Sequence, residues 1–203
     1  MTAIVRDNVD ENRRRILLVG TSAVGAAVAA GAVAPLLLSW FPSAKALAAG
    51  APVEVPIDKL EPGQQIIVEW RGKPIWVLRR SPEQLDTIRK NATADFLTDP
   101  ESKASKQPDY VKGPERAIKP EFFVAEGVCT HLGCSPTLKK EVGAASDMGG
   151  DWPGGYYCPC HNSRFDLSAR VFKGSPAPSN LVIPPHRYAS DTLLVIGEDT
   201  KSA

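Results

Sequence analysis

Two short segments hold all four cysteines of this 203-residue chain and two of its three histidines. The first is Cys129-Thr130-His131-Leu132-Gly133-Cys134, and the second, which begins 24 residues after Cys134, is Cys158-Pro159-Cys160-His161. One thiolate and one imidazole from each of two loops form the ligand set of a 2Fe-2S centre in which histidines replace the cysteines on one iron. The sequence therefore predicts an iron-sulfur site that two loops build together.

A zinc site and a disulfide framework are the two alternatives. A structural zinc site needs four ligands and usually takes its cysteines about two to four residues apart, whereas these segments offer six candidate ligands at shorter spacings. Four cysteines could form two disulfides in three connectivities, but a pure disulfide framework would leave both nearby histidines without a role. We favour the cluster over both alternatives.

The front of the chain predicts a membrane anchor. A basic cluster, Asn12 to Leu17, runs into Ile16 to Phe41, a stretch of 26 residues without a charge. A helix of that length crosses a bilayer core of about 30 Å with some tilt. Its many glycines and alanines suit close packing against other membrane helices. We expect one transmembrane helix over residues 16–41.

The arginines set an orientation and a route of export. Basic residues before the span favour a cytoplasmic N-terminus over residues 1–15, with everything after Phe41 across the membrane on the periplasmic side. Arg13 and Arg14 also have the form of a twin-arginine signal, a bacterial route that carries folded proteins. Cleavage is the alternative, because Ala44-Lys45-Ala46 has a small-x-small pattern, but 26 apolar residues exceed the usual signal core and favour a retained anchor in the bacterial inner membrane.

The rest of the chain predicts a linker followed by a mainly β domain. Residues 42–52 are mostly small, bury little and can switch between helix and coil, so we expect a flexible hinge. Within residues 53–203, Arg71-Gly72 predicts a two-residue hairpin between strands at 65–70 and 73–79. Ser81, Pro82 and Gln84 form the pattern of a capping box at the start of a helix that runs to about Lys90.

Further segments predict strands and surface. Short strands are expected at 121–126, 155–158, 164–167, 170–173, 181–183 and 192–197, which together indicate a β-sandwich or barrel. The polar residues 91–119 are interpreted as a surface excursion, and His186, between Pro185 and Arg187, as part of a solvated loop. A net charge of +1 gives no reason to expect a polyanionic partner, and no nucleic-acid motif is present.

With these motifs the chain resembles the Rieske iron-sulfur proteins. The resemblance implies a Rieske-type β-sandwich with an inserted cluster-binding subdomain at about residues 127–178. It implies one Rieske 2Fe-2S cluster per chain, with Cys129 and Cys158 on one iron and His131 and His161 on the other. Cys134 and Cys160 would form a disulfide that braces the two loops, since one of them lies in each loop and an exported domain can keep such a bond. Ser163 matches the family serine that donates to a bridging sulfide, and Lys173 to Pro178 resembles the family's proline loop.

The anchor, the linker and the second cysteine pair together resemble the Rieske subunits of cytochrome bc1 complexes. Further likeness lies in Leu60 to Gln64, Trp70 to Pro74 and Ile118 to Pro120. The resemblance implies electron transfer from ubiquinol at cytochrome b to cytochrome c1, within a dimeric multi-subunit membrane complex that acts as a quinol:cytochrome c reductase and contributes to proton translocation. His161 would receive the quinol, with His131 as the second choice.

The family pattern also implies a docking tip and leaves one alternative. Leu132, Gly133 and Pro176 would surround the histidines and contact the partners. The alternative is a Rieske small subunit of a periplasmic oxidoreductase such as arsenite oxidase. Two positions depart from the family pattern: Asn162 stands where glycine is usual, and Phe165 stands where many quinol-oxidising members have a tyrosine. Asparagine tolerates a left-handed backbone better than most residues, so we expect the loop at Asn162 to keep its shape.

Overall fold

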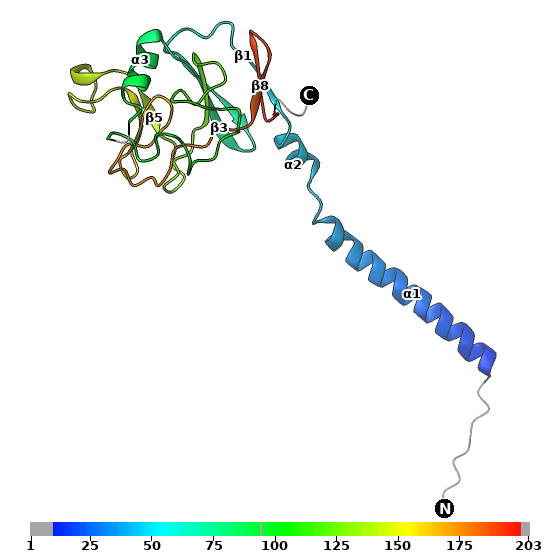
Figure 1. Ribbon diagram of the computed structural model, residues 1–203. Coiled ribbons are helices and arrows are strands. Elements are labelled where there is room, and N and C mark those ends of the chain that lie inside the picture. Colours follow the sequence, from blue (N-terminus) through cyan, green and yellow to red (C-terminus); the bar gives the residue numbers. More distant parts are fainter. Residues whose placement is uncertain (1–9, 94, 200–203) are drawn as a thin grey trace, which may run out of the picture. The chain divides into compact units, whose positions relative to one another are not determined.

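A computed structural model describes residues 10–93 and 95–199 of the chain. The chain divides into two compact units, one that ends at Ala48 and one that begins at Ala49. The first unit contains the helix α1, and the second contains every strand of the described chain, as Figure 1 shows.

Helix α1 spans Glu11–Leu38 and is long and apolar enough to cross a membrane. At about 1.5 Å per residue, its 28 residues measure about 42 Å. The helix begins five residues before the predicted start at Ile16 because the Asp10 side chain caps it, accepting from the backbone N–H groups of Asn12 and Arg13. Because of this earlier start, the three arginines lie in the first turns of the helix. The helix ends three residues before the predicted end at Phe41.

A second, short helix occupies part of the predicted linker. Helix α2 spans Ala44–Ala49, and the hydroxyl of Ser43 accepts from the N–H of Ala46 in its first turn. Of the helix and coil that the sequence allows for this segment, the small residues adopt the helix. The division between the two compact units falls inside α2.

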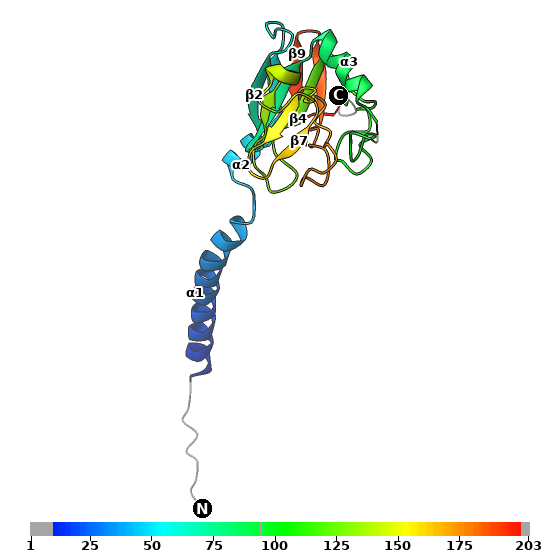
Figure 2. The ribbon, with the colours of Figure 1, turned by 90° about the vertical axis from the view of Figure 1, so that its left-hand side faces the viewer.

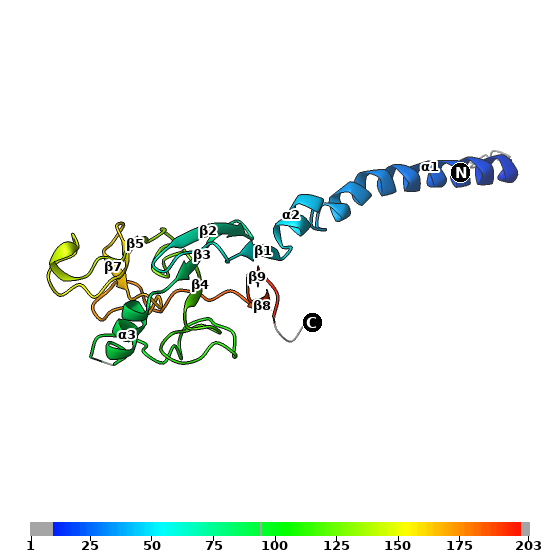
Figure 3. The same ribbon diagram turned by 90° about the horizontal axis from the view of Figure 1, so that it is seen from above.

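The larger unit contains three antiparallel three-stranded sheets. The first has the order β1-β9-β8, the second β2-β3-β4 and the third β5-β6-β7. Figures 1 and 3 both show the second sheet between the other two. The strands span Val53–Pro56 (β1), Gln65–Trp70 (β2), Lys73–Arg79 (β3), Phe122–Glu126 (β4), Thr137–Lys139 (β5), Gly155–Cys158 (β6), Ser163–Phe165 (β7), His186–Ser190 (β8) and Leu193–Ile196 (β9).

Two strands of the middle sheet, β3 and β4, are buried on both faces, because they are apolar at most positions. Successive side chains of a strand point to opposite faces. Ile75 and Val77 pack with β1 and β9, where Leu194 and Ile196 complete one core. Trp76 and Leu78 pack on the other face, into a second core that includes residues of β6 and β7.

The fold is therefore a mainly β sandwich with an inserted subdomain, as predicted. Sheets β1-β9-β8 and β2-β3-β4 form the sandwich, and β5, β6 and β7 come between β4 and β8 in the chain. Figure 2 faces the end of the larger unit that carries β7. The loops that leave β4 and β6 carry the two cysteine- and histidine-containing segments.

The local predictions with strong turn and cap signals are confirmed. The β2–β3 hairpin has the predicted bounds, with Arg71 and Gly72 at positive φ values of 53° and 71°. Helix α3 spans Pro82–Lys90, and Ser81 and Gln84 form the reciprocal capping box. A further 3-10 turn, η1, spans Gly143–Ala145.

Other predictions are wrong. Residues 181–183 form no strand, because their backbone groups bond to three separate segments: Leu181 donates to Ala169, Ile183 donates to Lys106, and Val182 O accepts a single bond from the end of β4. Residues 170–173 make only isolated bridges, and the strand predicted at 164–167 ends at Phe165.

The polar segment 91–119 is more than a surface excursion. Its residues Leu97, Val111 and Arg116 are at most 1% exposed, so the segment covers the second core. The prediction that His186 lies in a solvated loop is also wrong. His186 begins strand β8 and is 1% exposed.

Candidate metal centre

The first loop leaves β4 at Gly127, where only glycine fits. A Cβ atom on Gly127 would lie 2.3 Å from the ring of Trp76, and its N–H donates to Pro74 O at 2.7 Å. The loop then closes on itself. The N–H of Cys129 donates to Cys134 O at 2.7 Å, and the N–H of Gly133 donates back to Cys129 O at 3.0 Å.

The second loop connects β6 to β7 and turns at Asn162. Asn162 has a φ of 64°, and its N–H donates to Cys158 O at 3.0 Å. The hydroxyl of Tyr157 donates to the Asn162 side-chain oxygen. The expectation that asparagine replaces glycine in a left-handed conformation is confirmed, and the side chain gains a bond that glycine could not make.

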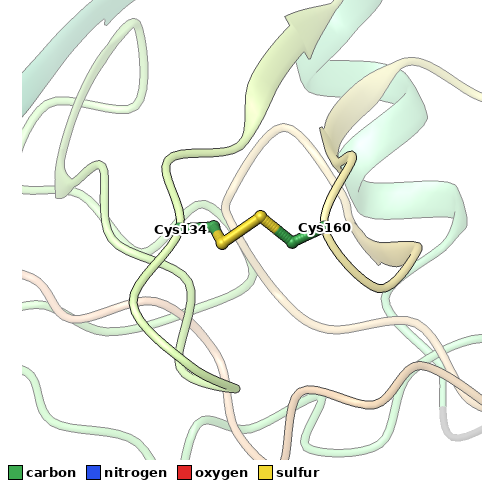
Figure 4. Close-up of a disulfide and its surroundings, with 2 residues drawn as sticks. All are labelled: Cys134 and Cys160. Atoms are coloured by element: carbon green, nitrogen blue, oxygen red, sulfur yellow. A yellow bond between two sulfur atoms is a disulfide. The ribbon is translucent and has the colours of Figure 1, made fainter.

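A disulfide joins the two loops, as predicted. Cys134 and Cys160 are bonded, with an S–S distance of 2.07 Å, and Figure 4 shows the bridge running from one loop to the other. The remaining cysteines, Cys129 and Cys158, are free and only 3% and 2% exposed. The sulfur of Cys158 lies within 4.8 Å of both bridge sulfurs. Because those two sulfurs are spent in the disulfide, the thiols left to bind a metal are Cys129 and Cys158.

The two histidines lie together on the outer side of these loops. The rings of His131 and His161 are 4.7 Å apart between centroids and nearly perpendicular. Nδ1 of His131 is buried and has no hydrogen-bond partner among the residues that the structure describes. A buried ring nitrogen without a partner is costly in an apolar setting and is the kind of atom that a metal satisfies.

A third loop closes the site from another side. The hydroxyl of Ser163 accepts from the N–H of Ala177 at 3.1 Å, and Thr130 Oγ1 donates to Ser179 O at 2.6 Å. Ser163 also hydrogen-bonds to the sulfur of Cys129. Burial raises the pKa of the Cys129 thiol, while the N–H of His131 and the Ser163 hydroxyl act in the opposite direction. The contacts of Thr130 were missed in the sequence, where its only signal is a hydroxyl between two candidate ligands.

These residues fit a 2Fe-2S cluster with mixed ligands. Two buried free thiols, two adjacent imidazoles and an unpaired ring nitrogen supply the required donor set. The Ser163 hydroxyl and the N–H of His131 act on the sulfur of Cys129, as in other metal sites that orient their ligands through surrounding groups. The assignment of each ligand to an iron stays a prediction.

Comparison with known proteins decides the family. Residues 99–185 match the model of the Rieske [2Fe-2S] domain. The ubiquinol-cytochrome c reductase iron-sulfur subunit of Allochromatium vinosum is 57% identical over 195 residues, which cover 96% of this chain and 93% of that protein. The chain belongs to the family of ubiquinol-cytochrome c reductase iron-sulfur subunits.

Other relatives extend the ubiquinol-cytochrome c reductase iron-sulfur subunit family to more distant organisms. The subunit of Blastochloris viridis is 39% identical and covers 94% of this chain and 96% of its own. The mitochondrial Rieske subunit of the cytochrome b-c1 complex of Neurospora crassa is 40% identical over 89% of this chain and 68% of its own. These relatives do not favour the alternative of an arsenite oxidase subunit.

The family assignment also covers the front of the chain. Residues 5–43 match the model of the "Ubiquitinol-cytochrome C reductase Fe-S subunit TAT signal". Together with helix α1, this match supports a Rieske protein that is anchored in a membrane and belongs to a multi-subunit complex.

The predicted docking residues are exposed. Leu132 is 70% exposed beside the histidines, and Gly133 and Pro176 are exposed on the first and third loops. Gly133 has a φ of 86°, which lets the first loop turn at its tip. Phe165, by contrast, is fully buried in the core that also contains Cys129 and Cys158.

Proposed function

We propose that this chain is the electron-transfer subunit of a bacterial quinol:cytochrome c oxidoreductase. In this proposal it takes one electron from ubiquinol at a site formed by cytochrome b and passes it to cytochrome c1. The reaction contributes to proton translocation because quinol oxidation releases protons on one side of the membrane. The observation that carries the proposal is the pair of adjacent histidine rings above two buried free thiols, in a chain 57% identical to such a subunit.

The proposed ligands are Cys129 and Cys158 on one iron, with His131 and His161 on the other. A histidine-ligated 2Fe-2S cluster supplies a one-electron acceptor with a potential of about −150 to +300 mV, which suits quinol oxidation. The disulfide braces the two ligand loops, and Ser163 donates toward the sulfur atoms of the site. The burial of both thiols keeps water away from them.

His161 is the residue proposed to accept the hydrogen bond from ubiquinol. It is exposed on the second loop, so a quinol hydroxyl can reach its ring and transfer a proton to the free ring nitrogen. His131 is the second choice, since it is only partly exposed. Leu132, Gly133 and Pro176 form an exposed surface around the histidines that suits docking to cytochrome b and then to cytochrome c1.

The anchor and the linker complete the proposal. Residues 1–15 lie in the cytoplasm, the span crosses the inner membrane once, and residues 53–203 lie on the periplasmic side. The positive-inside tendency of Arg13, Arg14 and Arg15 supports this orientation. Residues 42–52 act as a hinge between the two docking positions, which the division of the chain into two units at Ala48 supports.

Co-purification tests the proposed partners. A tagged full-length chain, extracted from its native membrane with detergent, should bring with it haem absorption of both b and c types. The purified complex should transfer electrons from a ubiquinol analogue to cytochrome c. A matched complex with His161→Gln should contain both haems but show greatly reduced turnover. A chain that purifies without either haem would contradict the assignment.

A further inference from the structure

Three arginines and one aspartate are buried together next to the second ligand loop. Arg80, Arg116 and Arg170 are at most 2% exposed, and Asp166 is 3% exposed. We name the three cations the arginine cluster. Charged groups are costly to bury unless they are paired or fully hydrogen-bonded, so such a group in one small domain needs an explanation.

Only one of the three cations has a buried carboxylate as its partner. Nε of Arg170 donates to Asp166 Oδ2 at 2.7 Å, and Nη2 forms a salt bridge with the same oxygen at 2.7 Å while it donates to Ile88 O at 3.0 Å. The other carboxylate oxygen of Asp166 accepts from the N–H groups of Ser168 and Arg170. Arg170 and Asp166 therefore cancel each other's charge.

Arg116 and Arg80 are held by neutral oxygen atoms instead. Arg116 donates to Ser168 O at 2.9 Å, to Leu181 O at 2.8 Å and to the Gln107 side chain at 2.9 Å. Arg80 donates to Ser168 Oγ at 2.9 Å and to the backbone oxygens of Glu115 and Pro120, both at 2.8 Å. These neutral oxygens accept hydrogen bonds without neutralising the charge, and Nη2 of Arg80 is buried with no partner among the described residues.

The partly exposed Asp99 acts electrostatically on Arg116, but its oxygens accept from the N–H groups of Lys103 and Ala104 and from the Ser105 hydroxyl, and no arginine of the cluster pairs with it in the described chain. Two other carboxylates are paired with cations outside the cluster. The Glu115 side chain binds Arg89 at 2.8 Å, and Glu126, the other buried carboxylate of the described residues, binds Lys73 at 2.6 Å. The three cations of the arginine cluster against Asp166 thus leave two positive charges in the interior. Burial lowers the pKa of Arg80 and of Arg116 to about 10, so both remain protonated at neutral pH.

The excess charge lies against the same core as the proposed thiolate ligands. Arg80 lies over the Phe123 ring at 5.1 Å, and Phe123 belongs to the core that contains Cys129 and Cys158. Ala169, a further acceptor of Arg116, belongs to the core that contains Cys129 and Cys158. An apolar interior screens charges much less than water does.

We propose that the arginine cluster raises the reduction potential of the iron-sulfur site through its uncompensated positive charge. The inference rests on the proposed function, in which quinol donates one electron to the site. That electron makes the site more negative by one charge, so a nearby buried cation stabilises the reduced form more than the oxidised form. The arginines touch no proposed ligand and act only through their field.

The test is a redox titration, followed by EPR, of the full-length chain in detergent. Arg80→Gln removes a charge, and Arg80→Lys retains the charge while losing most of the hydrogen bonds. Asp166→Asn removes the opposing charge. Arg187→Gln is the matched control, because Arg187 carries the same charge near the surface of β8, paired with Glu198 at 2.7 Å.

The expected order of potentials has Asp166→Asn highest, then wild type with Arg80→Lys and Arg187→Gln, then Arg80→Gln lowest. At an effective dielectric constant of about 20, Coulomb's law gives about a tenfold change in the equilibrium constant of reduction for a unit charge at about 12 Å, and a smaller change for a more distant charge. For one electron this change equals about 59 mV. Arg116→Gln and Arg116→Lys repeat the comparison if an Arg80 variant fails to fold.

Opposite signs separate a field from a structural effect. Equal potentials for the Lys and Gln variants, or a lower potential in Asp166→Asn, would overturn the proposal. A wild-type protein with a mixed-ligand EPR signal but with no shift in any variant would overturn this proposal alone. Absence of that signal from the wild type would overturn the proposed ligand set and this inference with it.

Discussion

The disulfide between Cys134 and Cys160 should contribute several kcal/mol to the stability of the larger unit. Its two cysteines are 26 residues apart in the sequence, so the bond removes a loop of that size from the unfolded chain. The chain-entropy relation for a loop of this length gives about 3.5 kcal/mol at 25 °C. For a domain of this size, such a loss corresponds to a fall in Tm of about 10 °C.

Three variants make this estimate testable: Cys134→Ser, Cys160→Ser and the double variant. Each removes the same cross-link, so all three should lose about the same free energy of unfolding. Urea unfolding followed by tryptophan fluorescence measures that loss, and the iron content of the same samples reports cluster retention. Cluster loss on storage should be faster in all three variants. Losses that add in the double variant, or a loss below about 1 kcal/mol, would refute the loop-closure account.

Three further predictions concern other parts of the chain. Phe165→Tyr places a hydroxyl in the core that contains Cys129, and if this hydroxyl donates to that sulfur in the reduced state only, a net bond of about 0.5 to 1.5 kcal/mol raises the reduction potential by roughly 20 to 65 mV. An unchanged or lower potential measured by voltammetry would exclude this contact. The double variant Arg13→Lys with Arg14→Lys should leave the larger unit in the cytoplasm, whereas Arg15→Lys, which keeps the twin arginines, should allow normal export. Normal access of a periplasmic protease to the double variant would disprove the export signal. Burial lowers the pKa of His186, so the contribution of this residue to stability is complete above the unfolded-state pKa of about 6.5 and is lost as the pH falls below that value. Between about pH 6.5 and 5 the urea midpoint of His186→Gln should therefore decline less than that of the wild type, and parallel declines of the two midpoints would contradict this.

The sequence predicted best those elements that local chemistry determines. The β2–β3 hairpin depends on two turn residues, and helix α3 depends on one capping box, so each signal lies next to the structure it produces. The disulfide joins cysteines that are 26 residues apart, and its prediction came from the family resemblance rather than from local chemistry. Asn162 took the expected left-handed conformation since its short polar side chain tolerates it.

Elements that depend on distant partners could not be predicted in this way. Residues 181–183 have strand-forming side chains, but their backbone bonds are divided among three distant segments rather than made to one strand. Arg116 lies in a polar segment and is nevertheless fully buried, because carbonyl oxygens from residues 52 to 65 positions away accept its hydrogen bonds. His186 follows two prolines that indicate a loop, yet Tyr110, 76 positions away, bonds to its backbone and packs against its ring.

The most direct test of the central claim is the EPR spectrum of the reduced full-length chain and of its ligand variants. Mixed cysteine and histidine ligation predicts a rhombic spectrum with a feature at a g value of about 1.9. Separate replacement of Cys129, His131, Cys158 or His161 should abolish it, while replacement of Cys134 or Cys160 should leave a weaker spectrum of the same shape. A spectrum that survives the loss of either histidine would contradict the proposed ligand set.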